Sequence, residues 1–509
     1  MLRTWDIFDT LIARKCIFPV NVFHIIEQIS QVKGFVNIRI ISEQTIAKIN
    51  TNYKLNDIYN VMCQISNINV QLAEKLKKLE CDIEIDQAIP INENLHQVKS
   101  GDILISDMYL PEKIIAKMLD KVGLFVPVEI VVTSNGKSSN RIWQQIKEQN
   151  EYLFHTGDNE INDVKNPRLF DFDSSWTILS RVNDFENLLL NKDYNFASYL
   201  RELRLKNPFN EEIKQIYWTM FVMNIGILLL LIPIIDKIQK KYGFEYLGFC
   251  GRDVYYMYCL YKKFKLDKNE NELSIDYLYY SRKLVVNSEK DLTKYFGDRI
   301  KNKKALLIDL YGTGMHLNKL REETNLNYSI MICKWMGYNT AINTYPKMNL
   351  SQNWTNIEYD DKLASMEYLN FCIIDLDREG WPKKDHLELV NRATHNSPIR
   401  MKAITIDDKI IPKVTFSEVN DTENLDVFEL CMKEILNSKI QWSIMNDIKD
   451  IIMTVKSLLL IFNAHADKLI FKNKHFMQEI ADTILRGDDS MKNVTPPPPI
   501  MIIYCLQYL

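Results

Sequence analysis

The sequence predicts an α/β protein: a Rossmann-like parallel sheet with an inserted helical cap, a second α/β domain, and a helical C-terminal region. Three observations carry this prediction. Residues 1–190 alternate short apolar runs with amphipathic stretches, the pattern of a parallel sheet covered by helices. Within them, residues 18–96 have helical periodicity and are far too long for a simple crossover. A second alternating block spans residues 195–345, and residues 346–509 are first mixed and then helical.

Length and composition exclude several classes of protein. At about 150 residues per domain, 509 residues predict about three domains. The chain is 46% hydrophobic and 25% charged, with a net charge of −3, all ordinary for a globular protein. These values argue against a disordered tail, a disulfide-stapled miniprotein or a basic nucleic-acid-binding sleeve, so no nucleic-acid partner is expected.

Cysteine usage and the N-terminus predict a cytoplasmic protein. The nine cysteines are scattered and form no C-x-x-C motif, which is typical of a reducing compartment. The opening residues MLRTWDIFDT lack a basic region followed by an apolar stretch, so no signal peptide is expected.

In the first domain, four apolar runs are expected to be strands: residues 2–6, 102–106, 129–133 and 152–156. In the second, the apolar helix at 216–238 is expected to lead into strands at residues 244–250, 275–280 and 305–310, with a helix at 254–264. Further on, a hairpin turning at Asp407–Asp408 and several amphipathic helices over 422–487 are expected. The prolines at 496–499 are read as a stiff spacer or, alternatively, a proline-recognition ligand.

One segment is apolar enough to cross a membrane. Residues 216–235 are free of charge and reach the length that a bilayer requires. A helix that is apolar all round also occurs buried inside a large domain. We expect the buried helix and no membrane span, because Asn224, Gly226 and Pro233 interrupt the segment and a second alternating block follows it.

Four short motifs in the first domain follow the expected strands. They contain Asp6 and Thr10 after the first strand, Ser106 at the end of the second, Lys137 after the third, and Asp158 and Asp163 after the fourth. In open parallel sheets, ligands bind outside the carboxyl ends of the strands. Each residue alone has an ordinary explanation as a helix cap, turn residue or solvated charge. Their order and their shared position at strand ends favour a site.

These residue types suit phosphoryl chemistry. A carboxylate such as Asp6 can attack phosphorus and form an aspartyl phosphate. Because the attack joins like charges, it needs cations: Lys137, and a Mg²⁺ held by Asp6, Asp158 and Asp163. The Ser106 hydroxyl would donate to a phosphate oxygen.

With these motifs, residues 1–185 resemble the haloacid dehalogenase-like hydrolase superfamily. The resemblance implies that Asp6 is the nucleophile, that Thr10, Ser106 and Lys137 complete the catalytic set, and that Asp6, Phe8, Asp158 and Asp163 form the Mg²⁺ site. It also implies a helical cap at about 18–96. The wording FDTL, SDMYLP and GDNEIND is similar to a subgroup often encoded beside polysaccharide glycosyltransferases.

One position departs from this family pattern. Phosphatases of the family carry a general acid two residues after the nucleophile, where this chain has Phe8. Asp9 follows one residue later and is expected to point away from the site. Loss of a positioned general acid costs about 10²–10⁴ in rate. An acyl or aryl phosphate would therefore turn over better than an ordinary sugar phosphate.

A second set of residues closes the strands of the second domain. Glycine-containing turns from a strand into a helix present N–H groups that suit phosphate; the candidates are Gly251, Arg252, Asp253, Arg282, Asp309, Gly312, Thr313 and Gly314. This block weakly resembles the type I phosphoribosyltransferase fold, although Leu310 stands where that family expects a second acid. Helix caps and tight turns explain the same residues equally well.

The sequence therefore predicts a Mg²⁺-dependent hydrolase of a small phosphorylated metabolite, in a glycan or polysaccharide pathway with glycosyltransferases as partners. Two alternatives stay open. One is a phosphoribosyl- or glycosyl-type transferase centred on Asp309, with a regulatory first domain. The other is a non-catalytic assembly protein.

Overall fold

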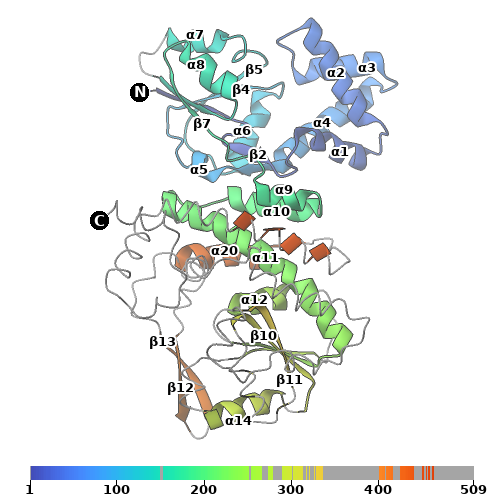
Figure 1. The fold of residues 1–509 in the computed structure, drawn as a ribbon. Coiled ribbons are helices and arrows are strands. Elements are labelled where there is room, and N and C mark those ends of the chain that lie inside the picture. The colour runs from blue at the N-terminus through green and yellow to red at the C-terminus, as the bar shows by residue number, and fades with distance from the viewer. Residues whose placement is uncertain are drawn as a thin grey trace, which may run out of the picture. The chain divides into compact units, whose positions relative to one another are not determined.

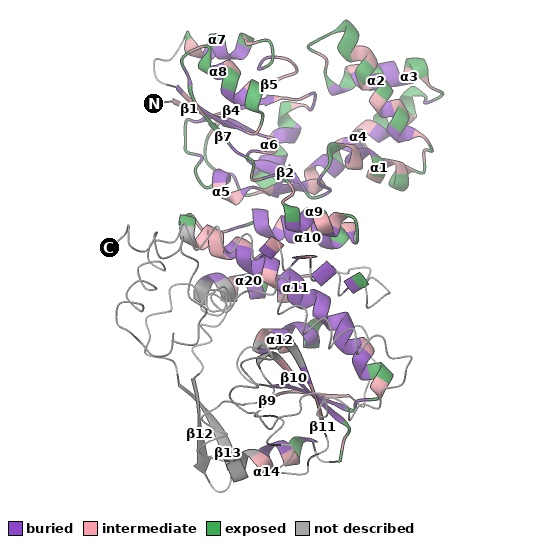
Figure 2. Cartoon of the chain, viewed as in Figure 1, coloured by how far each residue is buried: buried purple, intermediate pink, exposed green. Residues whose placement is uncertain are grey.

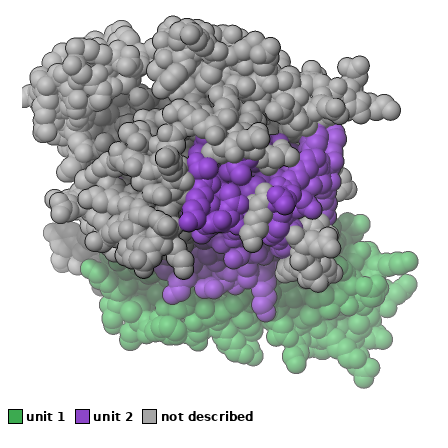
Figure 3. Space-filling model, turned by 90° about the horizontal axis from the view of Figure 1, so that it is seen from below, with its two compact units in different colours: residues 1–215 green, residues 216–509 purple. Residues whose placement is uncertain are grey.

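The computed structural model describes residues 2–148, 153–250, 254–265, 273–278, 289–300, 302–312, 328–335, 400–406, 409–415 and 425–440, with single positions up to 462 (Figure 1). The chain divides into two compact units, residues 1–215 and 216–509, which Figure 3 colours separately. Each unit is described by itself.

The first unit contains a five-stranded sheet in the order β5-β4-β1-β6-β7, with every neighbouring pair parallel. Its strands are β1 (Leu2–Asp6), β4 (Ile103–Asp107), β5 (Glu129–Thr133), β6 (Leu153–Gly157) and β7 (Asp173–Trp176). The α/β class with a parallel sheet is thus confirmed. The four expected strands are present, two of them displaced by one residue. The fifth, β7, has the sequence DSSW and no apolar run that could predict it.

Helices cover both faces of this sheet. Leu104 and Ile105 are neighbours on β4, yet they belong to different core clusters, because successive side chains of a strand point to opposite faces. Leu104 packs in the cluster that contains Ile115 of α6 (Glu112–Lys121). Ile105 packs in the cluster that contains Trp143 of α7 (Arg141–Lys147).

Four helices, here called the insertion helices, lie between the first and second strands of the sheet along the chain (Figure 1). They are α1 (Pro19–Ser30), α2 (Phe35–Ile49), α3 (Leu55–Ile65) and α4 (Val70–Gln87). The strands β2 (Ile12–Arg14) and β3 (Ala88–Pro90) pair antiparallel and close the two ends of the insertion. Figure 2 shows the mixture of buried and exposed faces expected of amphipathic helices. The expected helical span at 18–96 is largely correct, with β3 and the short α5 (Asn92–Leu95) near its end.

After β7 the first unit continues with α9 (Asp184–Leu190) and, beyond residue 190, with α10 (Tyr194–Leu205). Arg201 of α10 donates to the carbonyls of Arg14 and Ser180, both at 2.9 Å. Arg204 forms a bidentate pair with Glu186 of α9, at 2.6 and 2.9 Å. These bonds anchor both helices to the β2–β3 ribbon and the segment after β7.

The second unit contains a four-stranded parallel sheet in the order β11-β10-β8-β9. Its strands are β8 (Tyr246–Cys250), β9 (Ser274–Leu278), β10 (Ala305–Gly312) and β11 (Tyr328–Trp335), and its helices include α12 (Tyr255–Phe264) and α14 (Glu289–Ile300). The expected second α/β block is therefore present, and its sheet is parallel. The last strand, β11, was not predicted, and β10 continues two residues beyond its expected end at 310.

The apolar helix α11 (Glu212–Tyr242) contains the stretch long and apolar enough to cross a membrane, and 89% of its most apolar window is buried. Two polar side chains near its end are also buried and bonded. Asp236 accepts a hydrogen bond from the Tyr261 hydroxyl at 2.5 Å, and Gln239 donates to the carbonyl of Phe244 at 2.8 Å. The absence of a membrane span stays a prediction, with these contacts in its favour.

Towards the C-terminus, β12 (Arg400–Ile406) and β13 (Lys409–Thr415) pair antiparallel, which confirms the expected hairpin. Helix α20 (Leu425–Asn437) lies within the expected helical region. Asp407–Asp408 and the prolines at 496–499 lie outside the described residues.

Candidate active site

A pocket of about 340 Å³ lies at the carboxyl end of the first sheet. The sequence placed six polar residues after four strands, and five of them line this pocket: Asp6, Ser106, Lys137, Asp158 and Asp163. The sixth, Thr10, does not line it and contacts Asp6 instead. These residues come together because the carboxyl ends of parallel strands meet at one edge of a sheet.

Asp6 ends the central strand and is 6% exposed. The chain turns at once, since the N–H groups of Leu11 and Ile12 both donate to the carbonyl of Ile7, at 2.9 and 3.0 Å. This turn brings Thr10 back to Asp6, where its hydroxyl donates to Oδ2 at 3.0 Å. The other carboxylate oxygen, Oδ1, accepts from Nζ of Lys137. Thr10 thus orients the candidate nucleophile through this hydrogen bond.

Lys137 reaches the site from the loop between β5 and α7. Its side chain is buried between two carboxylates, donating to Asp6 and, at 2.8 Å, to Oδ1 of Asp163. Burial opposes the charge on this ammonium, but the two carboxylates raise the pKa of Lys137 above its usual value. The lysine is therefore a permanent cation at the bottom of the pocket.

Asp163 lies in the π-helical turn Glu160–Lys165 and holds several groups together. Its Oδ1 accepts from Lys137 and, at 3.3 Å, from Nε2 of His155, while its Oδ2 accepts from the N–H of Asn159 at 3.0 Å. Burial opposes its charge, yet Lys137 and His155 lower the pKa of Asp163. A Cβ at Gly157 would lie 2.4 Å from that of Asp163, so this approach requires glycine.

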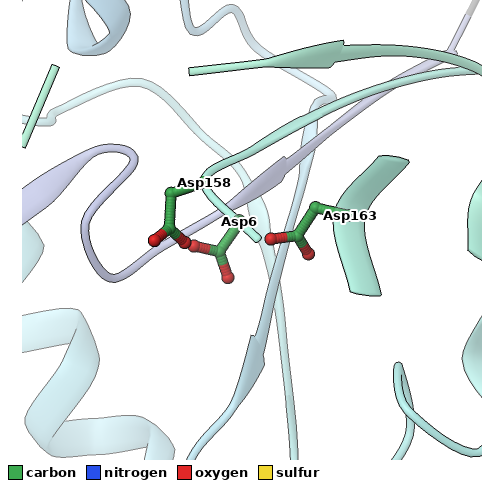
Figure 4. Close-up of side chains that lie close together, drawn as sticks. All are labelled: Asp6, Asp158 and Asp163. Atoms are coloured by element: carbon green, nitrogen blue, oxygen red, sulfur yellow. The ribbon is translucent and has the colours of Figure 1, made fainter. Parts of the chain in front are cut away.

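Three carboxylates converge at the pocket. Ligand atoms of Asp6, Asp158 and Asp163 all lie within 4.8 Å of one another, and Figure 4 shows Asp158 and Asp163 turned toward Asp6 from either side. Burial raises the pKa of Asp6 to about 8 despite Lys137, and the charges of Asp163 and Asp158 add to the rise. Burial and the charges of Asp9 and Asp163 raise the pKa of Asp158 to about 6.

This cluster fits a hard divalent cation. One lysine faces three carboxylates, and the pKa values of Asp6 and Asp158 are raised first by burial and then by the neighbouring negative charges. Carboxylate oxygens are the ligands that Mg²⁺ and Ca²⁺ prefer. Phe8 also lines the pocket, but its side chain carries no ligand atom, so only its main-chain carbonyl can contribute.

Ser106 is the penultimate residue of β4 and follows Ile105, the residue that pairs with Asp6. It is 2% exposed and lines the pocket, and no described residue forms a hydrogen bond with its hydroxyl. The hydroxyl is therefore available to donate to a bound oxygen.

The expectation that Asp9 points away from the site is wrong. Asp9 lines the same pocket as Asp6, and its charge raises the pKa of Asp158. The reason is its backbone, because Asp9 has a φ of 59° in the left-handed region. The alternation of side chains along an extended strand does not extend through such a residue.

Two residues important to this arrangement carry no role in the sequence analysis. Asp107 accepts hydrogen bonds from the N–H groups of Gly136 and Lys137, and His155 bonds to Asp163 from inside β6. The only signals in the sequence were the position of Asp107 directly after Ser106 and of His155 two residues before Gly157.

The candidate residues of the second unit are only partly described. Gly251, Arg252, Asp253, Arg282, Thr313 and Gly314 lie outside the described residues. Asp309 lies inside β10, paired with Ile332 of β11, and Gly312 is the last residue of that strand. Asp309 is thus three residues from the strand end rather than at it.

No protein-family model and no curated protein match the chain.

Proposed function

We propose that this chain is a phosphohydrolase of the haloacid dehalogenase-like type, dependent on a divalent cation and acting on a small phosphorylated metabolite. One observation carries the proposal: the Asp6 carboxylate faces a pocket that also presents an ammonium, a free hydroxyl and two more carboxylates. A carboxylate placed among a lysine and cation ligands can attack phosphorus. The sheet order, with the strand of Asp6 at its centre and a helical insertion directly after it, supports the proposal.

Each group has a chemical role that follows from its contacts. Thr10 and Lys137 orient the two oxygens of Asp6. Lys137 neutralises negative charge on the phosphoryl group, and Ser106 donates to one of its oxygens. Asp163 and His155 hold Lys137 in place. A Mg²⁺ held by Asp6, Asp158 and the Phe8 carbonyl, with Asp163 beside it, would neutralise further charge on the phosphoryl oxygens.

The reaction balances in two steps. A carboxylate oxygen of Asp6 forms a bond to phosphorus while the bond from phosphorus to the leaving oxygen breaks, and the electron pair departs with that oxygen. Water then attacks the phosphorus of the aspartyl phosphate, which releases inorganic phosphate and restores the carboxylate. The water proton passes to solvent or phosphate.

The test is hydrolysis of acetyl phosphate and phenyl phosphate by the full chain, with and without Mg²⁺, in the wild type and Asp6→Asn. We expect phosphate release that requires the cation and is lost in the variant. Asp120→Asn is the matched control, because Asp120 is an exposed carboxylate on α6 and does not line the pocket. Circular dichroism of both variants checks that they are folded.

Equal turnover in the wild type and Asp6→Asn would refute the proposal. Cation binding without turnover of any phosphate would point instead to a degenerate site in the first domain, and so to the alternative of a transferase centred on Asp309. Neither cation binding nor turnover would favour the assembly-protein alternative.

A further inference from the structure

The pocket has a second wall whose side chains take no part in the chemistry above. Here called the aromatic wall, it consists of Phe8, Phe23 and Tyr109 together with Arg14 and Glu43. Phe23 and Glu43 come from the insertion helices α1 and α2, and Tyr109 follows β4. The wall is therefore formed by the segment that follows Asp6, by the insertion helices α1 and α2, and by the segment that follows β4.

Aromatic rings in this wall are held by arginines. The Arg14 guanidinium lies over the Phe8 ring, 4.7 Å from its centroid. Arg39, which is fully buried behind the pocket, lies over Phe23 and Tyr109 at 4.6 and 4.8 Å. Such stacking fixes ring positions and leaves the opposite faces for other contacts.

The wall offers no free positive charge. Arg14 forms a bidentate pair with Glu84, at 2.8 and 3.0 Å. Arg39 forms a bidentate pair with Glu80, at 2.9 and 2.8 Å, and also donates to Glu43 at 2.8 Å. Two arginines thus face three glutamates, and Glu43 itself lines the pocket. A second phosphate or carboxylate on a substrate would meet negative charge here.

The size of the pocket sets a further limit. About 340 Å³ is near the lower end of small-molecule sites, which run from about 300 to 1,000 Å³. The space suits a single ring bearing a phosphate.

From these observations we propose that the substrate is an aryl phosphate monoester with no second anionic group, its ring packed against Phe8, Phe23 and Tyr109. This inference rests on the proposed phosphohydrolase function. Phe8 then has two consequences. It supplies an aromatic contact, and it replaces the carboxyl that would protonate a departing alkoxide. Because a phenol has a pKa of about 10, its phenolate is a stable enough anion to leave without such an acid.

The first step breaks the bond between phosphorus and the phenolic oxygen while Asp6 bonds to phosphorus. The phenolate leaves with the electron pair and takes a proton from water. The second step is the hydrolysis of the aspartyl phosphate described above.

Three substrates of similar size test separately the need for an aryl leaving group and the exclusion of a second anion. They are phenyl phosphate, 4-carboxyphenyl phosphate and cyclohexyl phosphate, and kcat/KM is measured for each with Mg²⁺. We expect the carboxylated compound to be at least about tenfold poorer than phenyl phosphate, because of charge repulsion at Glu43. Cyclohexyl phosphate should be poorer by about 10²–10⁴, since its alkoxide needs the missing acid. In Glu43→Gln, the ratio between phenyl and 4-carboxyphenyl phosphate should fall several-fold.

The outcomes distinguish the two proposals. Asp6-dependent turnover of acetyl phosphate with no preference for phenyl over cyclohexyl phosphate would overturn the aryl assignment and leave the phosphohydrolase standing. A carboxylated substrate as good as phenyl phosphate would overturn the exclusion of a second anion. Absence of Asp6-dependent turnover on every phosphate would overturn both.

Discussion

Asp107 holds the main chain of Lys137, the residue whose side chain meets Asp6. The Asp107 carboxylate accepts hydrogen bonds from the Lys137 N–H at 3.1 and 3.2 Å and from the Gly136 N–H at 3.0 Å. Asp107 ends β4 and Lys137 follows β5, so this contact ties two neighbouring strand ends together. Asp107 thus sets the position of Lys137 through the main chain of the lysine and does not pair with its ammonium.

Asp107→Ala should therefore weaken both stability and activity. The variant leaves the Lys137 N–H and the Thr133 hydroxyl without their acceptor, whereas the Gly136 N–H still donates to Thr133, and this loss costs about 1–3 kcal/mol in the free energy of unfolding. Turnover should fall by about 10- to 100-fold as Lys137 loses its position, by analogy with other supporting residues. Urea unfolding and phosphate release measure the two effects, and Asp107→Asn, which keeps one acceptor oxygen, should lie between wild type and alanine. Wild-type turnover in the alanine variant would contradict this role.

Stability without a cation should fall as pH rises from about 4 to 8. The pKa values of Asp6, about 8, and Asp158, about 6, lie above the value of ~3.9 expected in the unfolded chain. In this window Asp6 and Asp158 bind more protons in the folded protein than in the unfolded one, so the free energy of unfolding decreases with rising pH, and the lowered pKa of buried His155 offsets only part of this decrease. The lowered pKa of Asp163 acts outside this window, in more acidic solution, and the raised pKa of Lys137 acts in more alkaline solution.

Thermal unfolding in chelator-containing buffers between pH 5 and 8 measures this slope. Mg²⁺ should reduce it, because the cation stabilises the deprotonated carboxylates. Asp6→Asn should also reduce it, since the largest titrating contribution is removed. A melting temperature that rises across this range would contradict the prediction.

Substitutions of Asp158 and Asp163 should have different effects on cation binding and on the free energy of unfolding. Asp158→Asn removes a ligand and should weaken Mg²⁺ binding by more than the roughly 10- to 100-fold cost of losing an outer-shell partner, with little loss of stability. Asp163→Asn also removes the partner of Lys137 and His155, and loss of one member of a buried ion pair costs about 3–5 kcal/mol. Calorimetric titration and urea unfolding of the two variants give this comparison. Equal stability losses would refute the separate roles.

The insertion helices should depend on a buried pair. Arg39 of α2 and Glu80 of α4 are both 0% exposed, and the Tyr59 hydroxyl donates to Glu80 at 2.8 Å. Glu80→Gln leaves Arg39 with only Glu43, so we expect a loss of about 3–5 kcal/mol in the free energy of unfolding. The double variant Arg39→Met with Glu80→Leu should lose less, because neither member of the pair is left as an unpaired buried charge. A single variant as stable as wild type would show that Glu43 suffices.

The strands that sequence could predict are mostly those with their own apolar run. β4 and β5 contain such runs, ILIS and IVV. β1, with the sequence LRTWD, contains only Leu2 and Trp5, although its bounds are as expected. β7, and the three-residue strands β2 and β3, have no such run. They are strands because of the partners beside them, and those partners are distant in the sequence.

The sequence by itself determined the α/β class and the residues with suitable chemistry after the strands, since apolar periodicity and residue type are local properties. Tertiary structure alone decided what those residues contact. The left-handed backbone of Asp9 turns it into the pocket, Asp107 meets the loop of Lys137 across neighbouring strands, and Arg39 orders the aromatic wall from behind. Such contacts join residues far apart in the sequence, so no local pattern encodes them; the packing of the sheet and the insertion helices brings them together.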